Sequence, residues 1–328
     1  MARTLDTAAI RPGAVLDQPV YDLEGRLLLE AGTVLTESHL HQLRRLGYRG
    51  LAVRGAGEEP SHGIVSDRVH ALARGVVRKV FEAERAGRKW ELGPVREVVH
   101  ALIDSIDPRP TGRLRICDSR TEAEYLFAHN VQVCVLAVLV AKLMGLSERQ
   151  QVEIGVGAIL HDIGKIFVDE AILNKPGRLT EEEWEQIRRH PVDGFEILRR
   201  VPGCSILSAH IAYQHHERLD GSGYPRRLRG PDIHLHARIC AVVDVFDALI
   251  SDRPYRRALP VAGAMRVLRE QSGMKLDATA VGVLDRWLRS VAPQVFAEKQ
   301  ETRPAGSPLP GEAGRSSAAT DTTVGRDR

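Results

Sequence analysis

The stretch AILHDIGKIFVDEAILNKPG, residues 158–177, places His161, Asp162 and Lys165 inside a run of apolar residues typical of a protein core. A buried His-Asp pair costs free energy unless a partner or a metal ion compensates both groups. The stretch therefore indicates either a well-satisfied structural pair or the floor of an active site. If the helix continues through it, Lys165 lies one turn after His161 on the same face.

Bulk composition bounds the class of protein. The 328 residues are enough for one large domain and a smaller one, and 43% hydrophobic with 27% charged residues is typical of a globular chain. The formal net charge of +3 is close to balance and does not indicate a nucleic-acid or membrane-surface partner. The four cysteines have no CxxC spacing, which argues against a disulfide framework and suits a reducing cytosol.

Helical periodicity dominates the chain from about residue 64. The run VCVLAVLVA, residues 133–141, is nine residues long, too short to span a bilayer, and predicts a buried core helix. Capping-box patterns open two of the predicted helices, at Ser147 and Thr180. The predicted helices cover residues 65–87, 95–106, 125–145, 147–165, 181–190, 204–217, 235–251, 260–272 and 277–290.

The domain organisation follows from changes in pattern. Alternating apolar residues and a short helix within residues 14–54 predict a small α+β module over 1–55, followed by a linker over 56–63. Residues 64–296 are predicted to form a mostly α helical bundle. Residues 297–328 have no aromatic residue and many Pro, Gly, Ser and Thr, so we expect them to be disordered. The N-terminus has no long apolar run, and we expect no signal peptide.

Imidazole and carboxylate groups recur in or beside the apolar helices of 125–256, and they include five of the thirteen histidines. A single histidine on an apolar helix face is more often a satisfied core residue than a ligand. Several such groups converging on a bundle core are how helical proteins build dinuclear metal sites, and they suit Mn²⁺, Fe and Zn²⁺. The candidate ligands are His129, His161, Asp162, His190, His215, His216 and Asp244.

Basic residues and a loop complete the candidate site. Lys165, Arg253 and Arg256 beside metal cations describe a site for a phosphate ester, although an arginine pair alone more often lies in a solvated loop. The loop Gly223-Tyr224-Pro225 has its backbone restricted by glycine and proline, and its tyrosine offers a ring and a hydroxyl.

The chain resembles the HD-GYP family, a subgroup of the HD phosphohydrolase superfamily. The resemblance runs through HDIGK (161–165), ILNKPGRLTEEEW (172–184), RHPVDGFEIL (189–198), HHERLDGSGYP (215–225), ARICAVVDVFDAL (237–249) and DRPYR (252–256), in register over about 125–290. It implies a helical bundle with an iron or manganese centre that hydrolyses cyclic di-GMP to pGpG or GMP. It also implies that the seven candidate ligands bind metal, and that Asp162 and Lys165 are catalytic residues.

The same resemblance assigns the substrate contacts. Lys165, Arg253 and Arg256 would contact the phosphates, with Gly223, Tyr224 and Pro225 shaping the pocket beside them. The module at 14–54 is similar to an accessory domain often attached to such enzymes. This chain departs from the family at His234, with His236 nearby, and we expect both histidines at the surface.

The number of metal ions depends on Tyr125. Members with three metals resemble one another in a glutamate four residues before the first ligand histidine, which here is His129. A neutral phenol with a pKa near ~10 is a poor ligand for these cations. Glu122 and Glu124 point to other helix faces, so we expect two divalent ions, iron or manganese.

Three hypotheses remain open. The first is a metal-dependent cyclic di-GMP phosphodiesterase, and the second is an HD nucleotidase of other specificity. The third is a non-catalytic cyclic di-GMP sensor that docks a partner, which the complete ligand set disfavours. We expect a cytoplasmic protein without DNA or membrane contact, possible protein partners at the N-terminal module or the GYP loop, and a possible homodimer.

Overall fold

The structure is a computed structural model that describes residues 3–22, 24–48, 50–55, 61–108, 113–115, 122–175, 177–251, 258–293 and 296. The predicted disordered tail, 297–328, lies outside the described residues. Arg253 and Arg256 also lie outside them.

The N-terminal segment is the predicted small α+β module. Its antiparallel sheet has the order β1-β5-β2, formed by β1 (Arg3–Asp6), β5 (Gly50–Arg54) and β2 (Val15–Leu16). A hairpin of β3 (Val20–Tyr21) and β4 (Leu27–Leu29) precedes α1 (Glu37–Arg45). Thr36 caps α1 through the His39 amide, and Gly47, with φ +87°, makes the turn after it. Leu16, Leu40 and Val53 belong to a small core of its own.

Most of the rest of the described chain is helical, as predicted. The bundle is built from α2 (Asp67–Arg85), α3 (Gly93–Ser105), α4 (Glu122–Leu143), α5 (Glu148–Ile159), α6 (Glu170–Leu173), α7 (Glu181–Arg188), α8 (His190–Leu198), α9 (Ile206–Gln214), α10 (Leu235–Ile250), α11 (Val261–Gln271) and α12 (Ala278–Val291). Two 3-10 turns, η1 (Ile163–Phe167) and η2 (Gly230–Asp232), interrupt it. The predicted capping boxes at Ser147 and Thr180 are both formed.

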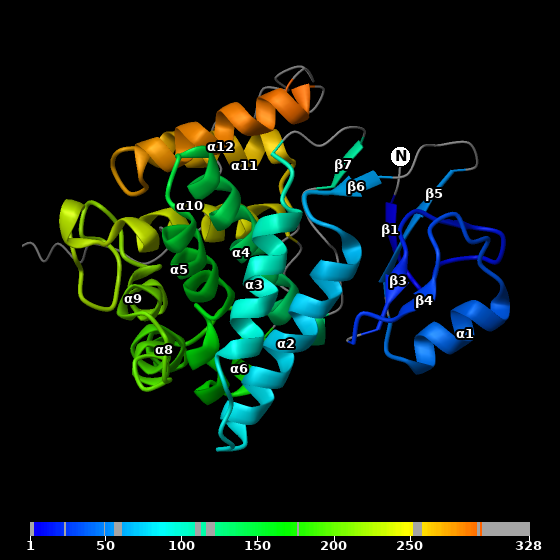
Figure 1. Cartoon of the computed structure of the whole chain (residues 1–328), viewed down its shortest axis with the longest axis horizontal. Helices are drawn as coiled ribbons and strands as arrows, with labels where there is room; N and C mark the ends of the chain where they lie inside the picture. The colour runs from blue at the N-terminus through cyan, green and yellow to red at the C-terminus, as the bar shows by residue number, and fades with distance from the viewer. Residues whose placement is uncertain are drawn as a thin grey trace, which may run out of the picture. The chain divides into compact units, whose positions relative to one another are not determined.

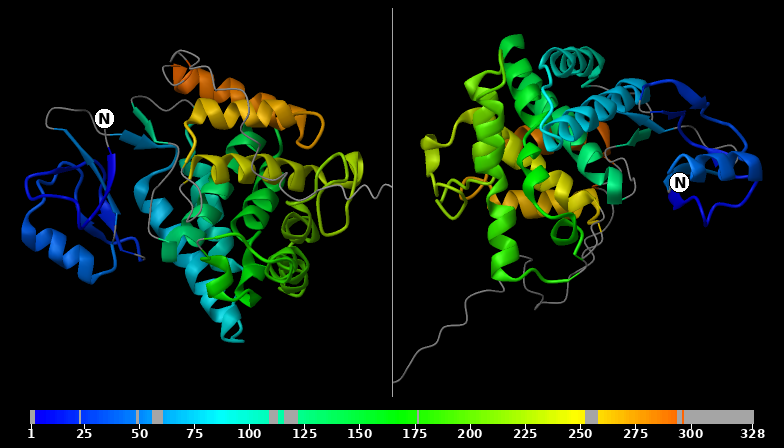
Figure 2. Two further views of the ribbon diagram at one scale, coloured as in Figure 1. Left: turned by 180° about the vertical axis from the view of Figure 1, so that it is seen from behind. Right: turned by 90° about the horizontal axis from the view of Figure 1, so that it is seen from below.

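Helix α4 is the centre of the bundle. Residues 128–141 are all buried, because α4 is apolar on every face and packs against α2, α3, α5, α10 and α12. Figures 1 and 2 show α11 and α12 side by side across one end of these helices. The helix that brings His129 into the bundle is therefore held on all sides.

The predicted core helix is thus confirmed, but its apolar stretch is longer than the nine residues counted from the sequence. Leu126–Leu143, 18 residues, is long and apolar enough to cross a membrane, and 78% of it is buried inside the protein. The core helix of a helical bundle meets the same criterion, so this helix is weak evidence for a membrane span.

Two local features differ from the sequence analysis. The helix predicted over 147–165 breaks after Ile159, and His161-Asp162 precede the 3-10 turn η1. The predicted linker, 56–63, ends in β6 (Ser61–Gly63), which pairs in parallel with β7 (Arg113–Arg115). A parallel strand pair separated by two long helices leaves no local pattern in the sequence, so periodicity could not predict it.

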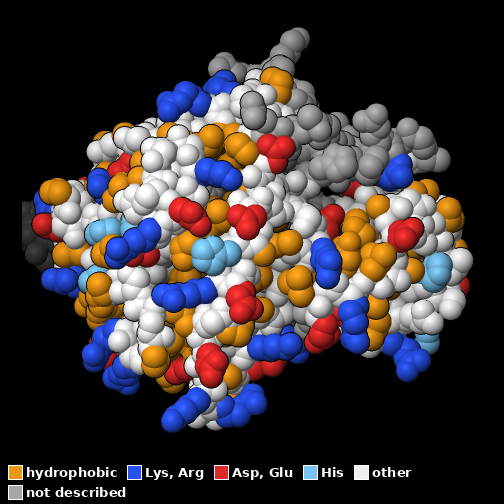
Figure 3. Space-filling view, in the orientation of Figure 1, with side chains coloured by type: hydrophobic (Ala, Val, Ile, Leu, Met, Phe, Trp, Pro, Cys, Tyr) orange, Lys and Arg blue, Asp and Glu red, His pale blue; other side chains and the backbone are white. Residues whose placement is uncertain are grey.

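Surface charge is mixed. On the face of the molecule shown in Figure 3, Lys and Arg side chains are interspersed with Asp and Glu, with apolar side chains between them. This distribution matches the near balance of 46 basic and 43 acidic residues.

Candidate metal centre

The HD pair lies where α5 gives way to η1. Leu160 ends α5 with a backbone near φ −115° and ψ 7°, and the chain then turns so that His161 and Asp162 both face inward. Gly164 allows η1 to press against α8, because a Cβ at this position would lie 2.1 Å from the His190 carbonyl oxygen. The break in the helix and this glycine together bring Asp162 next to His190.

Seven predicted ligands come together in two groups. His129, His161 and Asp162 form one set whose ligand atoms lie within 4.8 Å of one another, and His190, His215 and His216 form a second. Asp244 joins the first group, with its Oδ1 3.3 Å from His129 Nε2 and 4.0 Å from His161 Nε2. All of these side chains are buried except His216, which is partly exposed.

Asp162 lies between the two groups. Its Oδ2 is 3.8 Å from His129 Nε2 and 3.5 Å from His161 Nε2. Its Oδ1 is 3.4 Å from His190 Nε2 and 3.9 Å from His215 Nε2. One carboxylate thus presents one oxygen to each group, an arrangement that suits a ligand shared by two cations.

Hydrogen bonds to backbone carbonyls fix the tautomers of three histidines. The Nδ1–H groups of His161, His190 and His215 donate to the carbonyls of Ala158 (2.7 Å), Ile187 (2.6 Å) and Ala212 (2.9 Å). A carbonyl only accepts, so the proton of each neutral ring sits on Nδ1 and the Nε2 lone pair points into the cluster. Such bonds orient imidazoles for metal binding.

Two observations show that these residues fit a cation. His190 Nε2 and His215 Nε2 lie 3.2 Å apart, although both carry lone pairs in the tautomers just assigned. His161 Nε2 and Asp162 Oδ1 are buried and have no hydrogen-bond partner among the described residues. A positive ion at the centre of the cluster would satisfy all of these acceptors together, whereas a structural His-Asp pair would not leave them unsatisfied.

The pKa shifts of the cluster favour the protonation states that bind metal. Burial lowers the pKa of His161, His215 and His216, and lowers the pKa of His190 to about 4, so these rings are neutral near pH 7. Burial would raise the pKa of Asp162, but Lys165 and the surrounding histidines hold it well below its usual range. The lowered pKa values keep four imidazoles and one carboxylate in the unprotonated forms that bind metal.

His129 is the exception among the histidines. Burial lowers its pKa, but hydrogen bonds to Asp244 and Asp247 outweigh burial and raise the pKa to about 9. Its Nδ1 lies 2.7 Å from Asp247 Oδ2. Without a metal the ring is therefore an imidazolium between two carboxylates, and metal binding would displace the proton from Nε2.

Sequence reasoning gave Asp247 no role in this cluster, although a signal for it was present. Asp247 lies three residues after Asp244 on α10, is 2% exposed, and orients His129 from behind. A second carboxylate one turn from a candidate ligand is the pattern expected of a residue that supports a ligand histidine.

Lys165 lies at the candidate metal centre, as predicted. The prediction that a continuous helix brings it to the same face as His161 was wrong, because residues 160–162 are not helical. Its Nζ lies 2.5 Å from Asp162 Oδ2, and its side chain is 22% exposed while that of Asp162 is 1% exposed. The ammonium group therefore lies between the buried carboxylate and the solvent side of the centre.

The Gly223-Tyr224-Pro225 loop is fastened to the second histidine group. Tyr224 N donates to the His216 carbonyl at 3.3 Å, and the Tyr224 ring stacks on His216 with centroids 4.7 Å apart. A Cβ on Gly223 would lie 2.4 Å from that carbonyl oxygen, so only glycine allows this approach. The three residues are thus held directly beside a candidate ligand.

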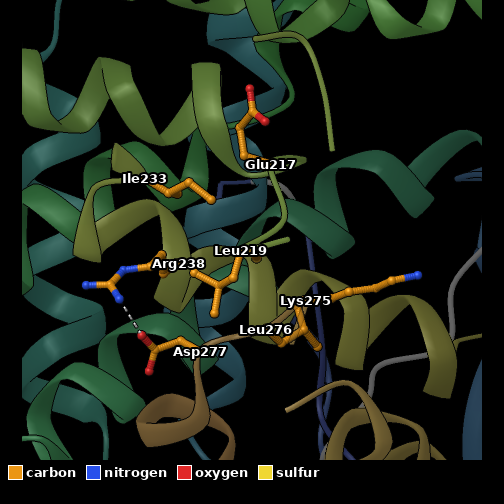
Figure 4. Close-up of a pocket in the computed structure, with 8 residues that line it drawn as sticks. Glu217, Leu219, Ile233, Arg238, Lys275, Leu276 and Asp277 are labelled. Atoms are coloured by element: carbon orange, nitrogen blue, oxygen red, sulfur yellow. Dashed lines mark ion pairs between the residues drawn. The ribbon is translucent and has the colours of Figure 1, made fainter. Parts of the chain in front are cut away.

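Glu217 holds the far side of the loop. Its buried carboxylate accepts from Arg226 N at 2.7 Å and Leu228 N at 2.9 Å. Glu217 also lines the small pocket of Figure 4 together with Leu219, Ile233 and Leu276, and Arg238 pairs there with Asp277 at 3.0 Å. Glu217 thus connects the residues after the loop to this pocket, and Leu219 N donates to the Lys275 carbonyl at 3.1 Å.

Three further residues near the candidate ligands are Tyr125, His234 and His236. Tyr125 lies in α4 four residues before His129, but its side chain is outside the described part of the chain, as are those of Glu122 and Glu124. The expectation that His234 and His236 are surface residues is wrong for His236, which is 2% exposed in the first turn of α10. His234 is partly buried and caps α10 through the His236 amide.

The fold and the buried His-Asp cluster define the class of protein, and a family comparison agrees. The protein-family model described as "HD domain" matches residues 97–280, more than half of the chain. The chain therefore belongs to the HD domain family, as the resemblance predicted.

Individual relatives share this region. A cyclic di-GMP phosphodiesterase of Pseudomonas aeruginosa is 36% identical over 224 residues, which are 66% of this chain and 54% of that protein. A cyclic di-GMP phosphodiesterase response regulator of Xanthomonas campestris is 47% identical over 152 residues, 46% of this chain and 40% of that protein. A 3'3'-cGAMP-specific phosphodiesterase of Vibrio cholerae is 37% identical over 174 residues, 53% of this chain and 37% of that protein. The chain spans about half or less of these relatives.

A solved structure confirms the fold. An HDG"Y"P protein from Bdellovibrio bacteriovorus matches with a TM-score of 0.55 and 16% identity, over 88% of this chain and 100% of that one. At this identity the likeness concerns the fold alone.

Proposed function

We propose that this protein is a metal-dependent phosphodiesterase that hydrolyses cyclic di-GMP to pGpG, GMP or both. The observation that carries the proposal is the pair of facing Nε2 atoms of His190 and His215, 3.2 Å apart, beside the unpartnered Asp162 Oδ1. The names of the Pseudomonas and Xanthomonas relatives support this substrate for the region that they share with the chain.

We propose two ions, iron or manganese, one for each group of ligands, with Asp162 shared between them. Divalent cations there would supply the charge that activates water and stabilises negative charge on the phosphoryl oxygens. The absence of a carboxylate at Tyr125 favours two ions over three. The proposed ligands are His129, His161, Asp162, His190, His215, His216 and Asp244.

The other side chains would orient the substrate. Lys165, held at Asp162 and partly exposed, would donate to a phosphate oxygen, and charge-assisted bonds of this kind are the strong ones. Arg253 and Arg256 are proposed as further phosphate contacts. The substrate pocket would be bounded on the side of His216 by Tyr224 and the flanking Gly223 and Pro225, because this loop is bonded to and stacked on His216.

The test is incubation of anaerobically metal-loaded protein with cyclic di-GMP, 3'3'-cGAMP and pGpG, with the products separated and identified. We expect pGpG or GMP from cyclic di-GMP, and no product after chelation. Hydrolysis of 3'3'-cGAMP alone would show that the substrate is the one in the name of the Vibrio relative and not cyclic di-GMP. Tight binding without turnover would support the sensor, and turnover of mononucleotides alone would support the HD nucleotidase.

We further propose a cytoplasmic location, where cyclic dinucleotide messengers act. The N-terminal module and the GYP loop are proposed as surfaces for protein partners, and a homodimer is compatible with either. The sequence gives no feature that favours contact with DNA.

A further inference from the structure

Trp184 is an exposed aromatic side chain on a well-fixed helix. Its side chain is 36% exposed, in the first half of α7. That helix is held at its start by the Thr180–Glu183 capping box and by Lys175, whose Nζ lies 2.7 Å from Glu183 Oε2. An exposed indole costs hydration free energy, so its presence on a rigid support is typical of a binding surface.

A row of stacked groups connects Trp184 to the candidate metal centre. The Arg188 Cζ, one turn further along α7, lies 5.5 Å from the Trp184 ring centroid and 5.6 Å from that of Tyr224. Tyr224 in turn stacks on His216, with centroids 4.7 Å apart and planes 23° apart. The row therefore starts at a candidate ligand and ends at an exposed indole.

Arg188 keeps hydrogen-bonding capacity within this row. Its Nη1 donates to Glu185 Oε1 at 3.0 Å. Its Nε is buried and has no partner among the described residues, so the capacity left for a ligand lies on the exposed part of the guanidinium. Glu185 and the two rings hold the guanidinium in place, and its side chain is still 38% exposed. A partly exposed, pre-positioned guanidinium between aromatic rings is suited to a flat ligand with hydrogen-bond acceptors on one edge.

A purine base has these properties. Nucleobases stack on exposed aromatic side chains, and a guanidinium donates bidentately to the O6 and N7 acceptors of guanine but not to adenine, which presents an amino group at position 6. We expect a base joined through ribose to a phosphate at the metal centre to lie along this row, because Tyr224 at its inner end stacks on the candidate ligand His216. The alternative, a surface cation–π contact, does not account for the continuity of the row with His216.

We propose that Trp184 and Arg188 bind one guanine base of the cyclic dinucleotide and set the preference for guanine over adenine. This proposal rests on the proposed function. The indole stacks on the base, and Arg188 donates to its acceptor edge. Both are specificity-determining residues, and neither touches the candidate metal ligands directly.

The experiment compares kcat/KM for cyclic di-GMP, cyclic di-AMP and bis(p-nitrophenyl) phosphate, a phosphodiester without a purine. Trp184→Ala should lower the ratio of cyclic di-GMP to bis(p-nitrophenyl) phosphate efficiency by about tenfold to a hundredfold, and Trp184→Phe by much less. Arg188→Ala should lower cyclic di-GMP efficiency more than cyclic di-AMP efficiency, and Arg188→Lys should not restore the preference. The neighbouring exposed Arg189, paired with Asp193, provides the matched control Arg189→Ala.

A binding readout independent of turnover uses indole fluorescence with chelated protein. Cyclic di-GMP should quench the fluorescence of the wild type, and the quenching should disappear in Trp184→Phe. Equal losses on all three substrates, or wild-type ratios in both alanine variants, would overturn the base site. A wild type that cleaves bis(p-nitrophenyl) phosphate but no cyclic dinucleotide would overturn the proposed function, and the base site with it.

Discussion

Two acceptor atoms of the candidate metal centre, one on His161 and one on Asp162, have no donor among the residues that the structure describes. In the absence of a cation, His161 Nε2 and Asp162 Oδ1 have no hydrogen-bond partner in the part of the chain that the structure describes. Each buried acceptor left unsatisfied costs on the order of 1–3 kcal/mol. At this scale the site is organised for a ligand and not for the stability of the fold.

Asp247 provides a test of that organisation at one residue. Asp247→Ala removes the acceptor 2.7 Å from His129 Nδ1, so the ring loses the bond that orients it. We expect metal affinity to fall by about tenfold to a hundredfold while the fold persists, measured by competition with a chelator. Asp285→Ala, on the surface of α12 and paired with Arg269, is the control. Unchanged affinity in Asp247→Ala would show that His129 does not need this support.

Much of the site could be predicted from residue types, and the rest depended on the fold. The seven ligand candidates were visible because histidines and carboxylates are unusual in apolar helices. In the structure these residues form two groups with Asp162 between them, because the chain leaves the helix at Leu160. The periodicity of the sequence predicted a helix that continues through this point. The burial of His236 was missed because the first turn of α10 shows no clear apolar face in the sequence.

At the scale of elements, the contact between η1 and α8 decides whether the two halves of the site meet. Gly164→Ala places a methyl group against the His190 carbonyl, at 2.1 Å without relaxation. We expect a loss of about 1–3 kcal/mol in the free energy of unfolding, together with weaker metal binding, because His190 must move. Urea denaturation and metal analysis give both values.

Gly263→Ala in α11 is the matched control for this substitution. A Cβ there meets nothing closer than 3.9 Å. We therefore expect this variant to gain about 0.5–1 kcal/mol from helix propensity and to bind metal normally. If the free energy of unfolding changed in the same direction in Gly164→Ala and Gly263→Ala, the packing of Gly164 against His190 would not explain the effect.

The first turn of α10 makes stability depend on pH. Burial, with the neighbouring His234, lowers the pKa of His236 from 6.5 to about 4. Between these values the unfolded chain binds a proton that the folded chain does not, so stability falls as the pH drops from 6.5 towards 4. The slope is at most about 1.4 kcal/mol per pH unit for one group.

His236→Phe should reduce this acid sensitivity. Thermal melts of chelated wild type and variant at pH 7.5 and 5.5 would measure it, with both proteins free of metal so that the metal centre contributes equally. We expect the melting temperature of the variant to fall less between the two pH values. His100→Phe, at an exposed position of α3, should behave like the wild type, and an identical acid loss in His236→Phe would refute the assignment.

At the scale of the whole molecule, the helical fold was predictable because long amphipathic and apolar helices carry their period in the sequence. The small α+β module was also predicted, and its apolar residues form a core that shares no residue with that of the bundle. What the sequence did not show is the pairing of β6 with β7, which joins segments about fifty residues apart.

Separate cores predict separable folding. A fragment of residues 61–296, which keeps β6 with its partner β7, should stay folded, hold metal and retain most of the activity. Circular dichroism melts, metal analysis and turnover of cyclic di-GMP would measure this. An insoluble fragment, or one that is folded but metal-free, would mean that the N-terminal module supports the bundle.

The most direct test of the central claim is the number of ions bound per chain after anaerobic loading with iron or manganese and removal of free metal. The account predicts two ions in the wild type, and loss of both in Asp162→Asn, which should keep a wild-type circular dichroism spectrum. Three tightly bound ions would refute the argument from Tyr125. A wild type that retains no metal would contradict the claim that the His-Asp cluster is a metal centre.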